Sequence, residues 1–133
     1  MRTRVRCGVL KGKCLCGAVT YQYNAAIQQS ILCFCTDCKK AQGAVFGWNS
    51  PIQQSEFQLL SGQSVLKEYF HTENKARVFC MQCGSPIYSY RTDLPNILRL
   101  RLGTVTSGRI PAPSELAYRE SQPDFMCIDT EML

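Results

Sequence analysis

The segment Cys33-Phe34-Cys35-Thr36-Asp37-Cys38 places three cysteines within six residues. As thiolates, Cys33, Cys35 and Cys38 would give one metal ion three ligands. Catalytic zinc sites commonly have three protein ligands and keep a fourth position for water or substrate. Zinc also lowers the pKa of a bound thiol and holds it as the thiolate. The segment therefore predicts a zinc site that is open to a substrate thiol, with these three cysteines as its catalytic residues.

Two further cysteine pairs predict a second, closed site. Cys14-Leu15-Cys16 is a C-x-C pair, and Cys80-Met81-Gln82-Cys83 is a C-x-x-C pair followed by Gly84. Residues i and i+2 of a strand point to the same face, and two sulfurs on one tetrahedral zinc ion lie roughly 3.8 Å apart. A slight bend, which Gly17 permits, would let both pairs bind one ion. Four thiolates leave no position for substrate, so this site is predicted to be structural.

Other roles for these cysteines stay open. Cys14 and Cys16 could be small buried apolar residues. Cys35 and Cys38 could form a redox couple, although the sequence around them lacks a thioredoxin-like βαβ pattern. The three-cysteine set could also be closed by a carboxylate or by one of Cys7, Cys127 and His71. The chain would then be a non-catalytic interaction module in which both zinc sites are structural.

Length and composition predict one soluble domain spanning residues 1–133. Nine cysteines and no secretory signal indicate a reducing compartment, so we expect a cytoplasmic protein with metal ligands rather than disulfides. The isolated Cys7 and Cys127 are expected to be free thiols, and His71 is expected at the surface. The formal net charge of +5 falls to about +2 once seven thiolates and two zinc ions are counted. We expect no nucleic-acid partner and no membrane span.

Strand patterns outnumber helix patterns and predict a mainly β domain. A hairpin is expected from two adjacent strands, 56–60 and 65–70, with its turn near Gly62. One short helix is expected over Thr36 to Gln42, with Thr36 as N-cap and Gly43 after its end. Further strands are expected at 18–23, 76–79, 87–90 and 97–102. In the last of these, Ile97, Arg99 and Arg101 should share one face, with Leu98, Leu100 and Leu102 on the other.

The order of these motifs resembles the glutathione-dependent formaldehyde-activating enzyme (GFA) family. The resemblance begins with the stretch Gly12 to Tyr21 and continues through the C-x-C-x-x-C segment, Gly43, Gly62 and Tyr69. It then includes Arg77-x-Phe79-Cys80-x-x-Cys83-Gly84-Ser85, Leu102-Gly103-Thr104, Pro113, Ser121 and Pro123. It covers about residues 10 to 125, and the combined order of the cysteine motifs is far more specific than any one of them.

The resemblance implies a β-tent fold similar to that of methionine sulfoxide reductase B. It implies that one zinc ion is structural and held by Cys14, Cys16, Cys80 and Cys83, and that a second lies at the active site, held by Cys33, Cys35 and Cys38. It also implies a carbon–sulfur lyase resembling S-(hydroxymethyl)glutathione synthase, with glutathione or another small thiol and a small aldehyde such as formaldehyde as partners. A glutathione site should contain basic residues, for which Lys39, Lys40, Arg99, Arg101 and Arg119 are available.

The chain departs from the family pattern at three places without losing a cysteine. Phe34 and Leu116 stand where the family usually has histidines. Gln122 and Phe125 replace a basic residue and a tryptophan near the C-terminus. Two imidazoles that could transfer protons are therefore absent, which favours the interaction-module alternative. If the chain is an enzyme, Asp37, a tyrosine or water is left for proton transfer.

Overall fold

The computed structural model describes residues 9–128 and confirms a mainly β chain. Its strands are β1 (Val9–Lys13), β2 (Thr20–Asn24), β3 (Ser30–Cys33), β4 (Gly47–Gln53), β5 (Phe57–Ser61), β6 (Leu66–Thr72), β7 (Lys75–Cys80), β8 (Pro86–Arg91), β9 (Leu94–Arg101), β10 (Val105–Ser107) and β11 (Pro113–Ala117). The α-helix is α1 (Thr36–Gln42), and the short 3-10 turns are η1 (Gln54–Glu56), η2 (Gln63–Val65), η3 (Leu102–Thr104) and η4 (Arg119–Ser121).

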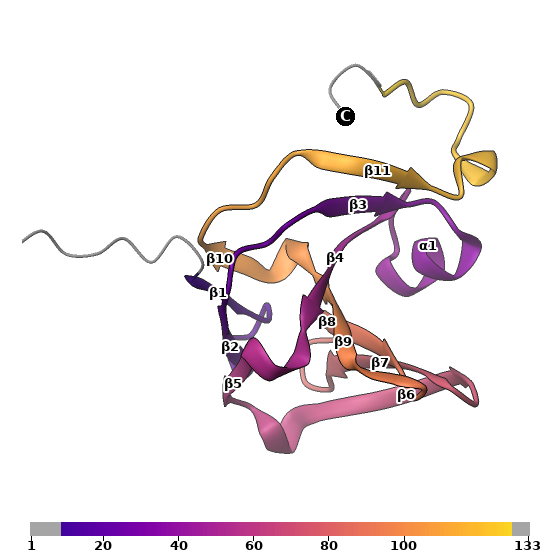
Figure 1. The fold of residues 1–133 in the computed structure, drawn as a ribbon. Helices are drawn as coiled ribbons and strands as arrows, with labels where there is room; N and C mark the ends of the chain where they lie inside the picture. Colours follow the sequence, from indigo (N-terminus) through magenta and orange to yellow (C-terminus); the bar gives the residue numbers. More distant parts are fainter. Residues whose placement is uncertain (1–8, 129–133) are drawn as a thin grey trace, which may run out of the picture.

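The strands form two sheets. One has four strands in the order β10-β1-β2-β5, and the other has seven in the order β11-β3-β4-β9-β8-β7-β6. Among the described strands of the larger sheet, β11 and β3 are parallel and the other neighbouring pairs are antiparallel. This sheet curves strongly, so that β11 and β3 lie far from β6, and α1 follows the end of β3 (Figure 1).

The predicted hairpin over residues 56–70 is wrong, although both of its strands exist. β5 pairs with β2 and β6 pairs with β7, so the two strands belong to different sheets. The turn between them is at Gly62, as expected, which has φ 94°. A Cβ at Gly62 would lie 2.6 Å from the carbonyl oxygen of Ala18, so both the conformation and the space require glycine. The chain uses this turn to leave one sheet for the other.

The core contains side chains from both sheets, among them Leu10, Tyr21, Ile52 and Ile87. The predicted alternation in β9 and the residue after it is also present. Leu98, Leu100 and Leu102 are at most 5% exposed and join this core. Ile97, Arg99 and Arg101 lie on the opposite face and line a cavity. The strand therefore separates the apolar core from a polar hollow.

Candidate metal centres and active-site cavity

The structure brings together Cys14, Cys16, Cys80 and Cys83, which we call the four-cysteine cluster. The Sγ atom of Cys16 lies 3.6 Å from that of Cys14 and 3.8 Å from that of Cys80. All four sulfurs lie within 4.8 Å of one another. These separations match the sulfur–sulfur distance expected around a tetrahedral zinc ion. Because the donors are all thiols at this spacing, the cluster fits a metal ion.

Two glycine turns form the four-cysteine cluster. Gly17 has φ 84°, and its N–H donates to the carbonyl oxygen of Cys14 at 3.1 Å. Gly84 has φ 83°, and its N–H donates to the carbonyl oxygen of Cys80 at 2.7 Å. Each turn follows the end of a strand and directs two sulfurs to one point. The bend expected at Gly17 is therefore present.

The thiols of the four-cysteine cluster differ in acidity. Hydrogen bonds from the Ser85 hydroxyl and backbone lower the pKa of Cys83 to about 5. A hydrogen bond from the backbone of Ala18 acts to lower the pKa of Cys16. Burial and the neighbouring cysteines outweigh it and raise that pKa to about 11. Cys83 is thus ready to bind a metal as a thiolate, whereas Cys16 must release a proton when a metal binds.

Cys33, Cys35 and Cys38, which we call the three-cysteine cluster, also come together, with their sulfurs within 4.8 Å. Cys33 ends β3, whereas Cys35 and Cys38 lie at the start of α1. The helix has the predicted bounds and ends at Gly43, but Thr36 is not its N-cap. The Sγ atom of Cys35 takes that role, accepting a hydrogen bond from the N–H of Cys38 at 3.2 Å. A cysteine can cap because its sulfur, like a serine oxygen, can accept from a free N–H of the first turn.

Gly47 supports the three-cysteine cluster, and the sequence analysis missed it. It pairs with Cys33 across β3 and β4. A Cβ added at Gly47 would lie 3.3 Å from the Cβ of Cys38 and 3.7 Å from its sulfur. The absence of a side chain lets β4 approach α1 closely. The only sequence signal was a glycine at the start of a strand, where glycine is otherwise unfavourable.

Within residues 9–128, no fourth His, Cys, Asp or Glu side chain joins the three-cysteine cluster. Cys127 is exposed and lies outside it, and Cys7 falls outside the described residues. His71 does not join it either. Its Nε2 atom lies 3.4 Å from Oδ2 of Asp37, and its side chain is 20% exposed, so it is partly buried, whereas a surface position was expected. The described cluster therefore provides three sulfurs and leaves one tetrahedral position without a protein ligand.

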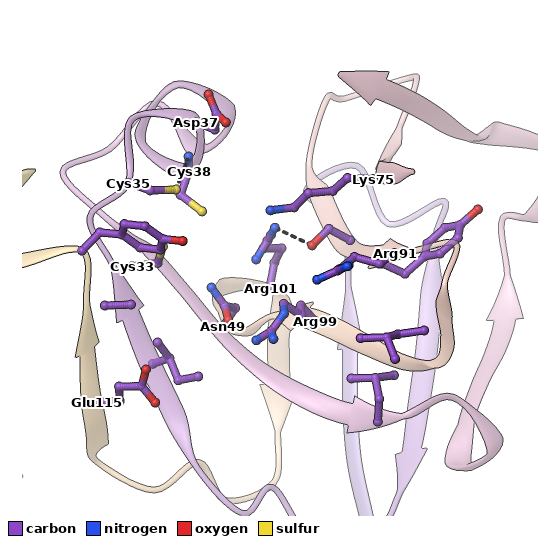
Figure 2. A pocket seen from close by; sticks show the side chains of 17 residues that line it. Cys33, Cys35, Asp37, Cys38, Asn49, Lys75, Arg91, Arg99, Arg101 and Glu115 are labelled. Carbon is purple, nitrogen blue, oxygen red and sulfur yellow. Dashed lines mark hydrogen bonds between the residues drawn. The ribbon is translucent and has the colours of Figure 1, made fainter. Parts of the chain in front are cut away.

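The three-cysteine cluster opens on a cavity of about 450 Å³. Figure 2 shows the cysteines on one side and a group of basic side chains on the other, with Asp37 on the helix above the sulfurs. The basic residues are Lys75, Arg91, Arg99 and Arg101; Glu115 and Tyr118 also line the cavity. Two of these residues come from the set that the sequence offered, namely Arg99 and Arg101. Lys39, which also belonged to that set, instead donates to the carbonyl oxygen of Ser121.

Comparison of this chain with known proteins identifies its family. The model of the family described as glutathione-dependent formaldehyde-activating enzyme matches residues 9–121. The chain belongs to the GFA family. A crystal structure of a Rhodobacter sphaeroides protein is similar in fold, with a TM-score of 0.63 and 22% sequence identity over 80% of this chain and 99% of that one. None of the described helices has the length and apolar character needed to cross a membrane.

The two positions at which the resemblance implies histidine, 34 and 116, lie outside the cavity lining of this chain. Phe34 is 0% exposed and packs edge-on against Phe46, with ring centroids 5.7 Å apart. Leu116 lies between Glu115 and Ala117, which both line the cavity, and does not line it itself. Neighbouring residues of an extended chain point to opposite sides, which explains both observations. Phe34 and Leu116 therefore remove no proton-transfer group from this cavity.

Proposed function

We propose that the chain is a zinc-dependent carbon–sulfur lyase of the GFA type. It acts on the adduct of glutathione, or another small thiol, with a small aldehyde such as formaldehyde. The observation that carries this proposal is the three-cysteine cluster, which lacks a described fourth ligand and faces a cavity with basic walls. Cys33, Cys35 and Cys38 are the proposed catalytic residues.

Two zinc ions have separate roles in this proposal. The four-cysteine cluster is a closed structural site that ties the turn after β1 to the turn after β7. The three-cysteine cluster would hold the second ion with one position left for substrate. When bound there, zinc supplies a positive charge that keeps a substrate thiol in its thiolate form.

The cavity fits the body of a charged thiol. Its volume falls within the range of small-molecule sites, which is about 300–1,000 Å³. Glutathione has two carboxylates and one ammonium group. Lys75 and Arg99 are placed to pair with carboxylates, and Glu115 is placed to pair with the ammonium group. Arg91 is less available, because it already pairs with Asp93 at 2.7 Å.

The proposed step joins the thiol sulfur to the aldehyde carbon, while the proton of the thiol ends on the former carbonyl oxygen. The reverse step breaks the same carbon–sulfur bond and returns the proton. Asp37 and Tyr118 line the cavity, and His71 pairs with Asp37 from outside it. We assign the Asp37 carboxylate to hold the moving proton, with His71 orienting it.

The interaction-module alternative requires a ligand that closes the three-cysteine cluster. Neither Cys127 nor His71 does so in the structure, and no described carboxylate does so either. Among the closing ligands that the sequence suggested, Cys7 is the one that falls outside the described residues. The alternative also drew support from the missing histidines, but positions 34 and 116 do not line the cavity. The structure therefore favours the enzyme.

Native mass spectrometry of reduced protein, with and without glutathione, tests the proposal. We expect two zinc ions and one glutathione adduct. NMR exchange spectroscopy should then show faster interconversion of formaldehyde and its glutathione adduct. Cys38→Ser should lose one zinc ion and this catalysis, whereas Cys127→Ser should keep both. The proposal fails if the protein with two zinc ions binds neither glutathione nor another small thiol.

A further inference from the structure

Two arginines near the three-cysteine cluster have buried guanidinium nitrogen atoms and no carboxylate partner. Arg101 on β9 is 4% exposed; its Nη2 atom donates to the Ser89 hydroxyl at 2.8 Å, and its Nη1 atom is buried with no hydrogen-bond partner. Both Nη atoms of Arg77 on β7 are also buried without one. Within residues 9–128, neither guanidinium forms a salt bridge with a carboxylate. A buried cation is strongly unfavourable unless a nearby anion compensates it.

The cysteines of the three-cysteine cluster are the groups that can compensate these cations. Arg101 lines the same cavity as Cys33, Cys35 and Cys38, and Figure 2 shows it opposite these cysteines. Arg77 lines a second hollow together with Arg101. When a metal binds, the three cysteines would be thiolates, so the two guanidinium groups would lie beside buried negative charge.

A ligand bound elsewhere does not offer the same compensation. Arg77 and Arg101 also line a second hollow of about 340 Å³ that has mostly apolar walls, among them Val78 and Pro86. The three unpartnered nitrogen atoms are enclosed by protein, so an anion in that hollow would not touch them. The compensating charge is therefore assigned to the groups that share the first cavity with Arg101, among which the three cysteines would carry negative charge when a metal binds.

The charges buried beside the open position can be counted separately from those of the cavity wall that solvent screens, which are carried by Asp37, Lys75, Arg91, Arg99 and Glu115. Three thiolates and one zinc ion carry one net negative charge, and the two guanidinium groups carry two positive charges. One positive charge is left over before a fourth ligand binds. A thiolate ligand would neutralise it, whereas water or imidazole would leave it in a buried, poorly solvated place.

We propose that Arg77 and Arg101 are positioning residues that make the open position of the three-cysteine cluster select an anionic ligand, a thiolate, over a neutral one. This inference rests on the proposed function, because the thiolate is that of the substrate. The two arginines do not touch the reacting atoms. They act through the electrostatic potential at the metal and determine which kind of molecule can complete its coordination.

The test compares an anionic and a neutral ligand on protein loaded with Co²⁺. Visible absorption reports the binding of 2-mercaptoethanol, which has no charge besides its thiolate, and of imidazole. Arg101→Gln should weaken thiol binding about tenfold or more and change imidazole binding less than about twofold. Arg101→Lys keeps the charge and should bind both ligands nearly as wild type does. Lys67→Gln is the matched control, because it removes one exposed positive charge from β6, outside both cavities.

Each outcome decides between the alternatives. Equal losses for thiol and imidazole would show a structural role, and unchanged thiol binding would show no role, so both overturn the inference. If wild-type protein itself binds no thiol, the proposed function fails together with the inference. If Arg101→Gln does not fold, Arg77→Gln provides the same comparison. If both neutral variants lose the second metal ion, the inference stands where Arg101→Lys keeps it and falls where that variant loses it too.

Discussion

Replacing Phe34 with histidine introduces the residue that the family resemblance implies at this position, yet we expect it to destabilise this chain without helping catalysis. Phe34 is 0% exposed, and its ring packs against Phe46. The residues on either side, Cys33 and Cys35, line the cavity, whereas Phe34 does not. An imidazole at this position would therefore be buried away from the sulfurs and could not exchange protons with the substrate.

The expected loss of stability can be estimated from this burial. A fully buried large apolar side chain contributes about 1.5–3 kcal/mol, of which the smaller and more polar imidazole would keep only part. An imidazole N–H left without a partner adds about 1–3 kcal/mol to the loss. We expect about 3 kcal/mol in total. For a chain of 133 residues this corresponds to a decrease in melting temperature of roughly 10 °C.

The destabilisation by Phe34→His should grow at acidic pH. Burial favours the neutral imidazole, so its pKa in the folded protein lies below the value of about 6.5 in the unfolded chain. As the pH falls below about 6.5, the unfolded state binds a proton that the folded state does not. The free energy of unfolding then decreases relative to wild type.

Thermal unfolding followed by circular dichroism, at saturating zinc and at pH 7.5 and 6.0, measures this effect. Phe125→His is the control, because Phe125 is 83% exposed and its replacement should change stability by less than about 0.5 kcal/mol. The NMR exchange assay is run on both variants. A Phe34→His protein of unchanged melting temperature and increased exchange rate would refute the reasoning.

Three further predictions concern the metal sites. Cys7→Ser and Cys127→Ser should each keep two zinc ions in native mass spectra, and loss of one ion would identify a closing ligand. In folded metal-free protein at pH 6, iodoacetamide should label Cys83 before the other three cysteines of the four-cysteine cluster, because the Ser85 hydrogen bonds lower its pKa to about 5 and keep it a thiolate. Peptide mapping would contradict this if another cysteine of the four-cysteine cluster reacted faster. Gly47→Val should reduce the metal content of the three-cysteine cluster by pushing Cys38 aside, whereas Gly103→Ala, with open space around it, should keep full occupancy.

The sequence predicted the elements and the two cysteine clusters better than the strand pairing. Short chelate spacings such as C-x-C and C-x-x-C restrict sulfur positions locally, so both clusters could be proposed without knowledge of the sheets. Pairing depends on contacts between distant segments. The stretch around Gly62 has the local pattern of a hairpin, but β5 is taken by β2 and β6 by β7, which are better placed partners in the two sheets. The sequence of residues 56–70 alone does not show that β2 and β7 compete for these two strands.

Local sequence patterns also could not predict which residues line the cavity. His71 and Asp37 lie far apart in the sequence and meet because β6 and α1 come close in the curved structure. Lys75, on β7, likewise reaches the cavity only because the larger sheet is curved (Figures 1 and 2). The sequence motif shows that two histidines are missing from this chain. It does not show which groups can transfer protons, because that depends on which side chains line the cavity.

β9 shows what strand periodicity can predict and what it cannot. Alternation placed Arg99 and Arg101 on one face, and both line the cavity. It did not predict that Arg99 is exposed while Arg101 is buried. Arg101 pairs with the buried Asn49 of β4 and lies near α1, whereas Arg99 lies further from the cluster along the strand. Arg99 and Arg101 lie on the same face of β9 but differ in exposure, so we expect them to have different roles. Arg99 can meet the carboxylates of a substrate in solution-accessible space, and Arg101 can only act on the charge at the cluster. Because 2-mercaptoethanol has no carboxylate, its binding should depend on Arg101 and Arg77 but not on Arg99, and comparing it with glutathione separates the two contributions.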